Sequence, residues 1–169
     1  MKKLILDASH SDVSFKVKHL MISSVKGNFG TVMGSAEGEL DNMNVSVTID
    51  ASTINTNDEG RDEHLKGADF FQVRNFPSID FVANGQNVHN RTITGELTIK
   101  GVTKEVTLSL DYNGEGKDPW GNVKHGFEIS GKINRAEFGL TWNAALEAGG
   151  VLVGEDVTLS IDAQFVEQN

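Results

Sequence analysis

The chain has 169 residues, a length that suits one domain with a sizeable core. Its formal net charge of −9 repels nucleic-acid phosphates, so we expect no nucleic-acid partner. The absence of cysteine excludes disulfides, thiol catalysis and thiolate metal sites. The sequence shows no linker, low-complexity tract or solenoid repeat, and we therefore expect a single domain over residues 1–169.

The first residues begin like the n-region of a secretory signal, with Lys2 and Lys3 ahead of an apolar run. That run ends at Leu6, whereas a signal peptide needs roughly 7–15 apolar residues. No later stretch approaches the ~20 apolar residues that span a bilayer, so we expect no integral membrane segment. The sequence as written therefore predicts a cytoplasmic protein, with a secreted mature form as the alternative.

Alternation of apolar and polar residues with period two is the main signal along the chain. It begins in residues 13–18, where odd positions are apolar and even positions are polar. The same pattern recurs in residues 45–51, 92–100, 106–112, 127–134 and 157–165. Such alternation places one face of a strand inside and the other in water, as antiparallel sheets do.

Turn signals separate these runs and set the number of strands. Residues 100–104 read as a tight hairpin around Gly101, and residues 113–122 as a longer one. With the glycine-rich stretch 25–40 and the short run 79–82, we count about eight strands. The sequence therefore predicts an all-β fold, a closed eight-stranded antiparallel barrel, which is wide enough for its own side chains or one small ligand.

One segment breaks the alternation. Residues 57–66 are polar and rich in acids, with Asn57 as a plausible N-cap, and we expect a short helix around residues 58–66. A dense aromatic cluster follows in residues 69–77 and ends at Pro77.

Catalytic and metal-binding patterns are not visible. The five histidines share no ligand spacing, and the acids around residues 58–63 read as a capped, solvated helix start. There is no Gly-x-Ser-x-Gly and no phosphate-binding loop. We expect no catalytic residue, no metal and no cofactor; His19, on the inward face after Val17, is the one polar side chain expected inside.

Nine phenylalanines against one tyrosine indicate an interior without polar handles. This composition fits either an ordinary filled core or an apolar pocket, and inward glycines and alanines tilt the interpretation towards a pocket. The apolar, glycine-hinged segment 144–153 is equally consistent with a lid or with a loop folded over a barrel end.

Several blocks resemble the YceI-like family in order along nearly the whole chain. Each block is weak alone, and together they are specific. They are residues 10–20, 25–29, 61–66, 69–71, 76–81, 95–104 and 133–142.

The resemblance implies a lipocalin-like, extended barrel with a short helix that binds a long polyisoprenoid, such as an isoprenoid quinone, in an internal tunnel. It also implies a homodimer. Many members carry a signal peptide and act outside the cytoplasm, and this chain departs from them there. The resemblance transfers no polar ligand signature.

Strand parity supplies the candidate ligand-binding residues, with the aromatic clusters added. Met21 and Met33 are expected to adapt to the bends of an apolar chain. The candidates are Phe15, Val17, His19, Met21, Phe29, Phe71, Phe76, Phe81, Leu97, Ile99, Leu108, Phe127, Ile129, Phe138 and Trp142.

Three functions follow from these observations. The first is non-catalytic binding of a polyisoprenoid for carriage, storage or sensing. The second is a structural or stress-related dimeric interaction module with a filled barrel. The third is an enzyme acting on an isoprenoid, with His19 or Arg135 at the pocket.

Overall fold

The computed structural model describes residues 2–143 and 152–168. Over these residues the chain forms one α-helix, α1 (Glu59–Lys66), and three short 3-10 helices, η1 (Ala8–His10), η2 (Ala51–Thr53) and η3 (Arg135–Phe138). The strands are β1 (Lys2–Leu6), β2 (Asp12–His19), β3 (Ser23–Phe29), β4 (Val32–Glu39), β5 (Asn42–Asp50), β6 (Ile54–Asn55), β7 (Ser78–Gln86), β8 (Thr92–Ile99), β9 (Val102–Lys117), β10 (Val123–Asn134) and β11 (Val153–Glu167).

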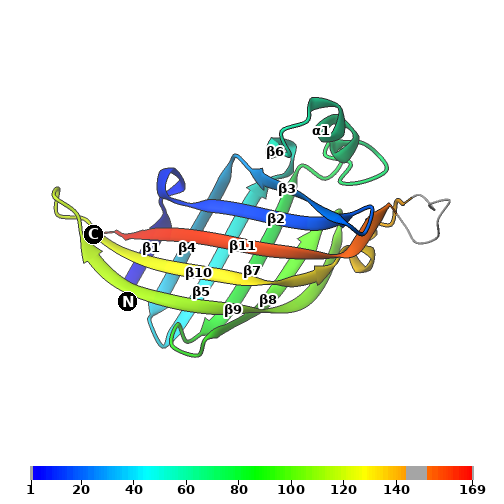
Figure 1. Cartoon of the computed structure of the whole chain (residues 1–169). Helices are drawn as coiled ribbons and strands as arrows, with labels where there is room; N and C mark the ends of the chain where they lie inside the picture. The colour runs from blue at the N-terminus through cyan, green and yellow to red at the C-terminus, as the bar shows by residue number, and fades with distance from the viewer. Residues whose placement is uncertain (1, 144–151, 169) are drawn as a thin grey trace.

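Eight of the described strands close into an antiparallel barrel (Figure 1), in the order β1-β4-β5-β7-β8-β9-β10-β11. The ring closes because β11 pairs with β1. The fold class predicted from the alternation is confirmed. One edge of β11 pairs with β10, and its other edge is long enough for two strands: its last residues pair with β1, and residues 153–162 pair with β2.

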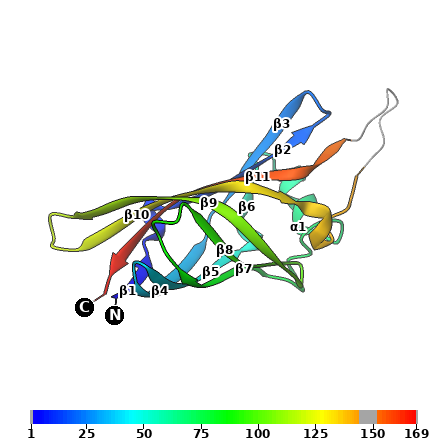
Figure 2. The same cartoon turned by 90° about the horizontal axis from the view of Figure 1, so that it is seen from below.

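The strands β2, β3 and β6 extend the sheet beyond that ring. β2 and β3 form a hairpin, and β3 pairs with β6, which follows β5 through η2. Figure 2 shows the hairpin and α1 towards one end of the molecule, and the turn between β9 and β10 at the other.

Alternation decides which face of each strand is buried. On β8, Ile93, Leu97 and Ile99 are buried, while Glu96 is exposed. The described core has two parts. One surrounds Leu4 towards the β1 end, and the other surrounds Phe138 near η3.

β1 was not expected as a strand. Its Leu4 is fully buried and pairs with Ala36 of β4 and Glu167 of β11. The apolar run that resembled the start of a leader therefore closes the barrel. None of the described helices is long and apolar enough to cross a membrane.

The helix begins one residue later than expected, and its cap differs. Asp58 is the N-cap, because its carboxylate accepts a hydrogen bond from the backbone N–H of Arg61 at 3.0 Å. Asn57 precedes it with φ of 62°, a left-handed conformation that asparagine tolerates better than most residues. The segment 144–151, expected as a lid or a folded loop, lies outside the described residues.

Candidate ligand-binding cavity

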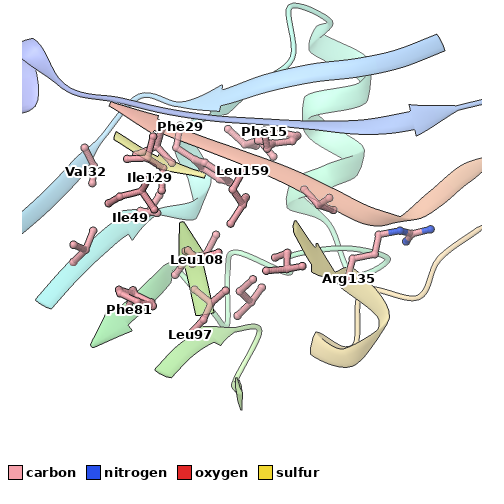
Figure 3. A pocket seen from close by; sticks show the side chains of 18 of the residues that line it. Phe15, Phe29, Val32, Ile49, Phe81, Leu97, Leu108, Ile129, Arg135 and Leu159 are labelled. Atoms are coloured by element: carbon pink, nitrogen blue, oxygen red, sulfur yellow. The ribbon is translucent and has the colours of Figure 1, made fainter. Parts of the chain in front are cut away.

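An apolar cavity of about 370 Å³ lies inside the barrel. Side chains from facing walls converge on it (Figure 3), with Phe15 and Leu159 on one side and Phe81 and Leu97 on the other. Valine, leucine, isoleucine and phenylalanine dominate the lining. Such a surface has few groups that could hydrogen-bond to a ligand, and it provides apolar contact area for a hydrocarbon.

Most of the candidate residues border this cavity, and their role in ligand binding stays a prediction. Those on strands lie on the apolar face that parity indicated, whereas Phe71 and Trp142 lie in irregular segments after α1 and η3. The candidates that border the cavity are Phe15, Val17, His19, Phe29, Phe71, Phe81, Leu97, Ile99, Leu108, Phe127, Ile129 and Trp142.

Three candidates do not line the cavity. Met21 lies in the turn after β2, where its side chain is 64% exposed. Phe138 belongs to η3 and is fully buried in the core with Ile79 and Leu140. Phe76 lies against Gly101, in the turn between β8 and β9. Met33, expected to adapt to an apolar chain, points outwards and is 65% exposed.

The candidate list also missed a large part of the wall. Val45, Val47 and Ile49 of β5 line the cavity, as do Leu159 and Ile161 of β11. The alternation had marked these positions as apolar-face residues. The same parity that selected Val17, Leu97 and Ile129 could therefore have found them.

Glycines in the wall allow large side chains to lie flat along it. A Cβ at Gly131 would lie 2.6 Å from Cδ2 of Leu108, and one at Gly27 would lie 2.5 Å from Cζ of Phe15. Both distances are shorter than carbon atoms tolerate. The missing Cβ atoms therefore leave room beside the wall and help to keep the lumen open.

The mouth of the cavity lies at the α1 end. Of the described lining residues, only Lys18 and His64 are exposed, and both lie there. The His64 ring packs edge-on against Trp142, at 4.8 Å between centroids, and against Phe70, at 5.1 Å. Its Nε2 lies 3.0 Å from a carboxylate oxygen of Asp69. This aromatic group joins α1 to the segments that follow α1 and η3.

Arg135 is charged and buried beside the mouth, with only 4% of its surface exposed. Its guanidinium donates to the carbonyl oxygens of Leu140, at 2.7 Å, Trp142, at 2.9 Å, and Val153, at 3.3 Å, while Nε donates to Gly154 at 2.8 Å. Burial lowers the pKa of Arg135. Four backbone acceptors give this side chain a positioning role.

Arg61, the other arginine that lines the cavity, is held in the same manner. Its Nε donates to the hydroxyl of Thr56 and its Nη2 to the Thr56 carbonyl, both at 2.8 Å. The Thr56 backbone N–H donates in turn to Asp62 at 2.9 Å. These bonds fix α1 against the end of β6.

A polar chain lies at the opposite end of the barrel. His125 is fully buried; its Nδ1 lies 2.6 Å from the Tyr112 hydroxyl and its Nε2 3.1 Å from Glu167 Oε1. Lys2 Nζ donates to the same carboxylate oxygen at 2.7 Å. Hydrogen bonds from Lys2 and His125 lower the pKa of Glu167, and burial raises the pKa of Tyr112.

The polar residues around His125 include the one group, among the described residues, whose ligand atoms lie close enough together to hold a metal ion. Atoms of Glu115, His125 and Glu167 lie within 4.8 Å of one another. Both ring nitrogens of His125 are within hydrogen-bond distance of Tyr112 or Glu167. His125 and Glu167 are therefore engaged in a hydrogen-bond network with Tyr112 and Lys2.

Comparison with known proteins gives consistent relatives. The YceI-like domain model matches residues 5–165. A UPF0312 protein of Staphylococcus aureus (strain USA300) is 40% identical over 169 residues, which is 98% of each chain.

Solved structures show the same fold. A Campylobacter jejuni YCEI protein has a TM-score of 0.74 at 32% identity, with 90% of each chain covered. A polyisoprenoid binding domain from Saccharophagus degradans has a TM-score of 0.71 at 12% identity, with 98% of each chain covered, and at that identity shows the fold alone. With a family model that spans the barrel and relatives along its full length, this chain belongs to the YceI-like family.

Proposed function

We propose that this protein binds the hydrocarbon chain of a polyisoprenoid or an isoprenoid quinone in its barrel, without catalysis. The carrying observation is the cavity of about 370 Å³ with its almost continuous apolar lining. The polyisoprenoid binding domain of the Saccharophagus degradans structure shares this fold and supports the choice of ligand class.

The energetics suit such a ligand. A polyisoprenoid has few hydrogen-bonding groups, so its affinity comes from apolar area removed from water, at roughly 25 cal/mol per Å² before ordering costs. The phenylalanine series Phe15–Phe29–Phe71, with successive ring centroids 5.6 and 6.1 Å apart, offers a rigid apolar surface along one wall.

The arginines beside the cavity support a non-catalytic role. A catalytic side chain must reach the reacting atoms, whereas the guanidinium groups of Arg61 and Arg135 are engaged by the protein's own oxygens. For the remaining candidate of the enzyme hypothesis, His19, we expect the His19→Ala variant to retain ligand binding. Turnover of an isoprenoid by the wild type and its loss in this variant would contradict a binding role.

The alternative, a structural module with a filled barrel, is disfavoured by the open cavity. The homodimer implied by the family resemblance is compatible with either function. Size-exclusion chromatography with light scattering tests it directly: we expect twice the 18.3 kDa chain mass, and a single chain mass would remove the dimer from the proposal.

Mass spectrometry of co-purified lipid tests the proposed function. We expect an organic-solvent extract of the purified protein to contain a polyprenyl species. We also expect the extracted protein to take up a polyprenyl quinone at one molecule per chain. A lipid-free extract together with no uptake by the extracted protein would contradict the proposal.

A further inference from the structure

The turn that joins β2 to β3 presents three consecutive large apolar side chains to solvent. Leu20 is 40% exposed, Met21 64% and Ile22 84%. The backbone does not favour these residues, because Leu20 and Met21 have φ of 55° and 60°, a region in which asparagine and glycine are preferred. Neither packing nor backbone conformation explains this apolar tip, defined here as residues 20–22.

The apolar tip lies next to the mouth of the cavity. Lys18 and His19, which precede it, line the cavity, and the backbone N–H of Leu20 donates to the carbonyl of Leu152, another lining residue, at 2.8 Å. In Figures 1 and 2 the β2–β3 turn lies towards the α1 end and away from the β9–β10 turn. A ligand that leaves through the mouth therefore passes beside the tip.

A row of lysines crosses the outer face of the strands that lead to the tip. Lys132 pairs with Thr158, Thr158 with Lys16, and Lys16 with Lys26 across β10, β11, β2 and β3. All three lysines are exposed, and Lys16 and Lys26 are direct cross-strand neighbours, an arrangement that costs stability by itself. This lysine row is a basic patch on a chain of net charge −9.

Other charged groups near the tip are mixed in sign. Lys18 adds a positive charge, while Glu155 and Asp156 in the bulge of β11 are exposed acids. On the outer face of β2, β3 and β11, Lys16, Lys18 and Lys26 outnumber these two acids, so this face attracts anions, while α1 at the same end carries the exposed acids Asp58, Glu59 and Glu63.

We propose that the apolar tip inserts into the surface of a lipid bilayer, with Lys18 among anionic headgroups and the lysine row within range of their charge, so that the ligand passes between bilayer and cavity. This inference rests on the proposed function. At about 3.3 Å per residue, Lys18 lies roughly 7 Å and Lys16 roughly 13 Å from Leu20. A headgroup layer is roughly 5–7 Å thick, so Lys18 lies within it. The lysine row lies outside the layer but within about one Debye length of it, so the row still attracts anionic headgroups.

A second copy of the chain is a less suitable occupant. A stable protein interface buries on the order of 1,000 Å² or more, and three side chains at a hairpin turn supply only a small part of it. A bilayer needs no complementary surface, and a few apolar side chains beside basic residues suffice for reversible attachment.

Vesicle co-sedimentation tests the docking. The probes are phosphatidylcholine vesicles with and without phosphatidylglycerol. We expect the Met21→Asn/Ile22→Ser variant, in which asparagine suits the positive φ of residue 21, to bind both kinds at least tenfold more weakly than wild type. We expect Lys16→Ser/Lys26→Ser to lose only the extra affinity for the anionic vesicles.

Trp120 supplies the matched control, since it is 84% exposed, as Ile22 is. It belongs to the turn between β9 and β10, and this turn lies at the opposite end of the barrel (Figure 1). We expect Trp120→Ser to bind vesicles as wild type does. Equal binding by the wild type and the tip variant, or equal losses in the tip and Trp120 variants, would overturn the docking. A lower mass of the tip variant in light scattering would assign the tip to a second copy instead.

A ligand assay without vesicles separates the two proposals. The tip variant should bind farnesol with wild-type affinity while extracting a polyprenyl quinone from vesicles at least tenfold more slowly. A wild-type protein that does not bind farnesol would contradict the proposed function. Normal farnesol binding with equal extraction rates would overturn the docking alone.

Discussion

A buried guanidinium holds the backbone at the mouth of the cavity. Arg135 donates to four carbonyl groups, those of Leu140 and Trp142 after η3 and those of Val153 and Gly154 at the start of β11. Charged hydrogen bonds of this kind are stronger than neutral ones, and their loss leaves buried acceptors without partners.

Arg135→Met is therefore expected to lower the free energy of unfolding by about 3 kcal/mol, measured by urea denaturation. Lys132→Met, three residues earlier at an exposed position, provides the control and should change stability by no more than about 0.5 kcal/mol. If both variants lost the same free energy of unfolding, the four carbonyl contacts of Arg135 would add nothing to stability.

Two carboxylates tie the beginning of the chain to the last strands. Lys2 and His125 lower the pKa of Glu167, and Asp7 has a lowered pKa because Ser9, His10 and Lys124 contact it through hydrogen bonds. A carboxylate whose pKa is lower in the folded state stabilises the fold above its ordinary pKa, and this contribution is lost as the pH falls.

Stability should therefore decrease as the pH falls below roughly 4, where unfolded carboxylates take up protons. Glu167→Gln should be less stable than wild type at pH 7, and the difference should narrow towards pH 3, in urea unfolding at each pH. A difference that stayed constant between pH 7 and pH 3 would show that the ion pair does not contribute.

At the scale of elements, strands β8, β9 and β10 form a wall whose glycines make room for larger neighbours. Gly131 of β10 lies beneath Leu108 of β9, and the conflicting atom of Leu108 is the end of a flexible side chain. An added methyl group can thus be accommodated by moving Leu108, which lines the cavity, towards the lumen.

Gly131→Ala should retain the fold but weaken ligand binding severalfold, in titrations with farnesol. Gly116→Ala, on β9 where a Cβ would meet no atom within 4 Å, should leave the affinity unchanged. A Gly131→Ala variant with full affinity would show that the ligand does not reach this part of the wall.

The loop after α1 separates two phenylalanines that the sequence could not tell apart. Phe71 lines the cavity and contacts Phe29 edge-on at 6.1 Å, whereas Phe76 packs beside Gly101 outside it. The sequence placed both in one aromatic cluster, because parity gives no direction in an irregular loop.

We expect Phe71→Ala to weaken farnesol binding at least tenfold, through the lost apolar contact. Phe76→Ala should keep the wild-type affinity, although both variants lose stability, which thermal unfolding would measure. If Phe71→Ala and Phe76→Ala lost the same farnesol affinity, the loop would influence binding only through its packing and not through contact with the ligand.

For the whole molecule, the sequence predicted the barrel because alternation is a local signal that each strand carries in its own residues. The sequence also predicted that the barrel closes, but it did not identify β1 as the strand that closes the ring. Leu4 pairs with Glu167 at the other end of the chain, and a five-residue strand has too short a pattern to indicate that partner.

The sequence could predict which strand residues line the wall of the cavity, but not which residues lie at its ends. Parity holds along a regular strand and fails once the chain turns, which explains the outward position of Met21 and the burial of Phe138 in η3. An open lumen depends on close approaches between strands, such as Leu108 over Gly131, that no single stretch of sequence reveals.

The dependence of affinity on ligand chain length tests the central claim most directly. In a Trp120→Phe variant, Trp142 is the sole tryptophan and lies at the cavity, so its fluorescence reports binding of geraniol, farnesol, geranylgeraniol and longer prenols. We predict that affinity rises steeply with each isoprene unit until the lumen is filled and then levels off, because each buried methylene group contributes roughly 0.8 kcal/mol before ordering costs. An affinity that does not change with chain length would contradict binding of the hydrocarbon chain inside the barrel.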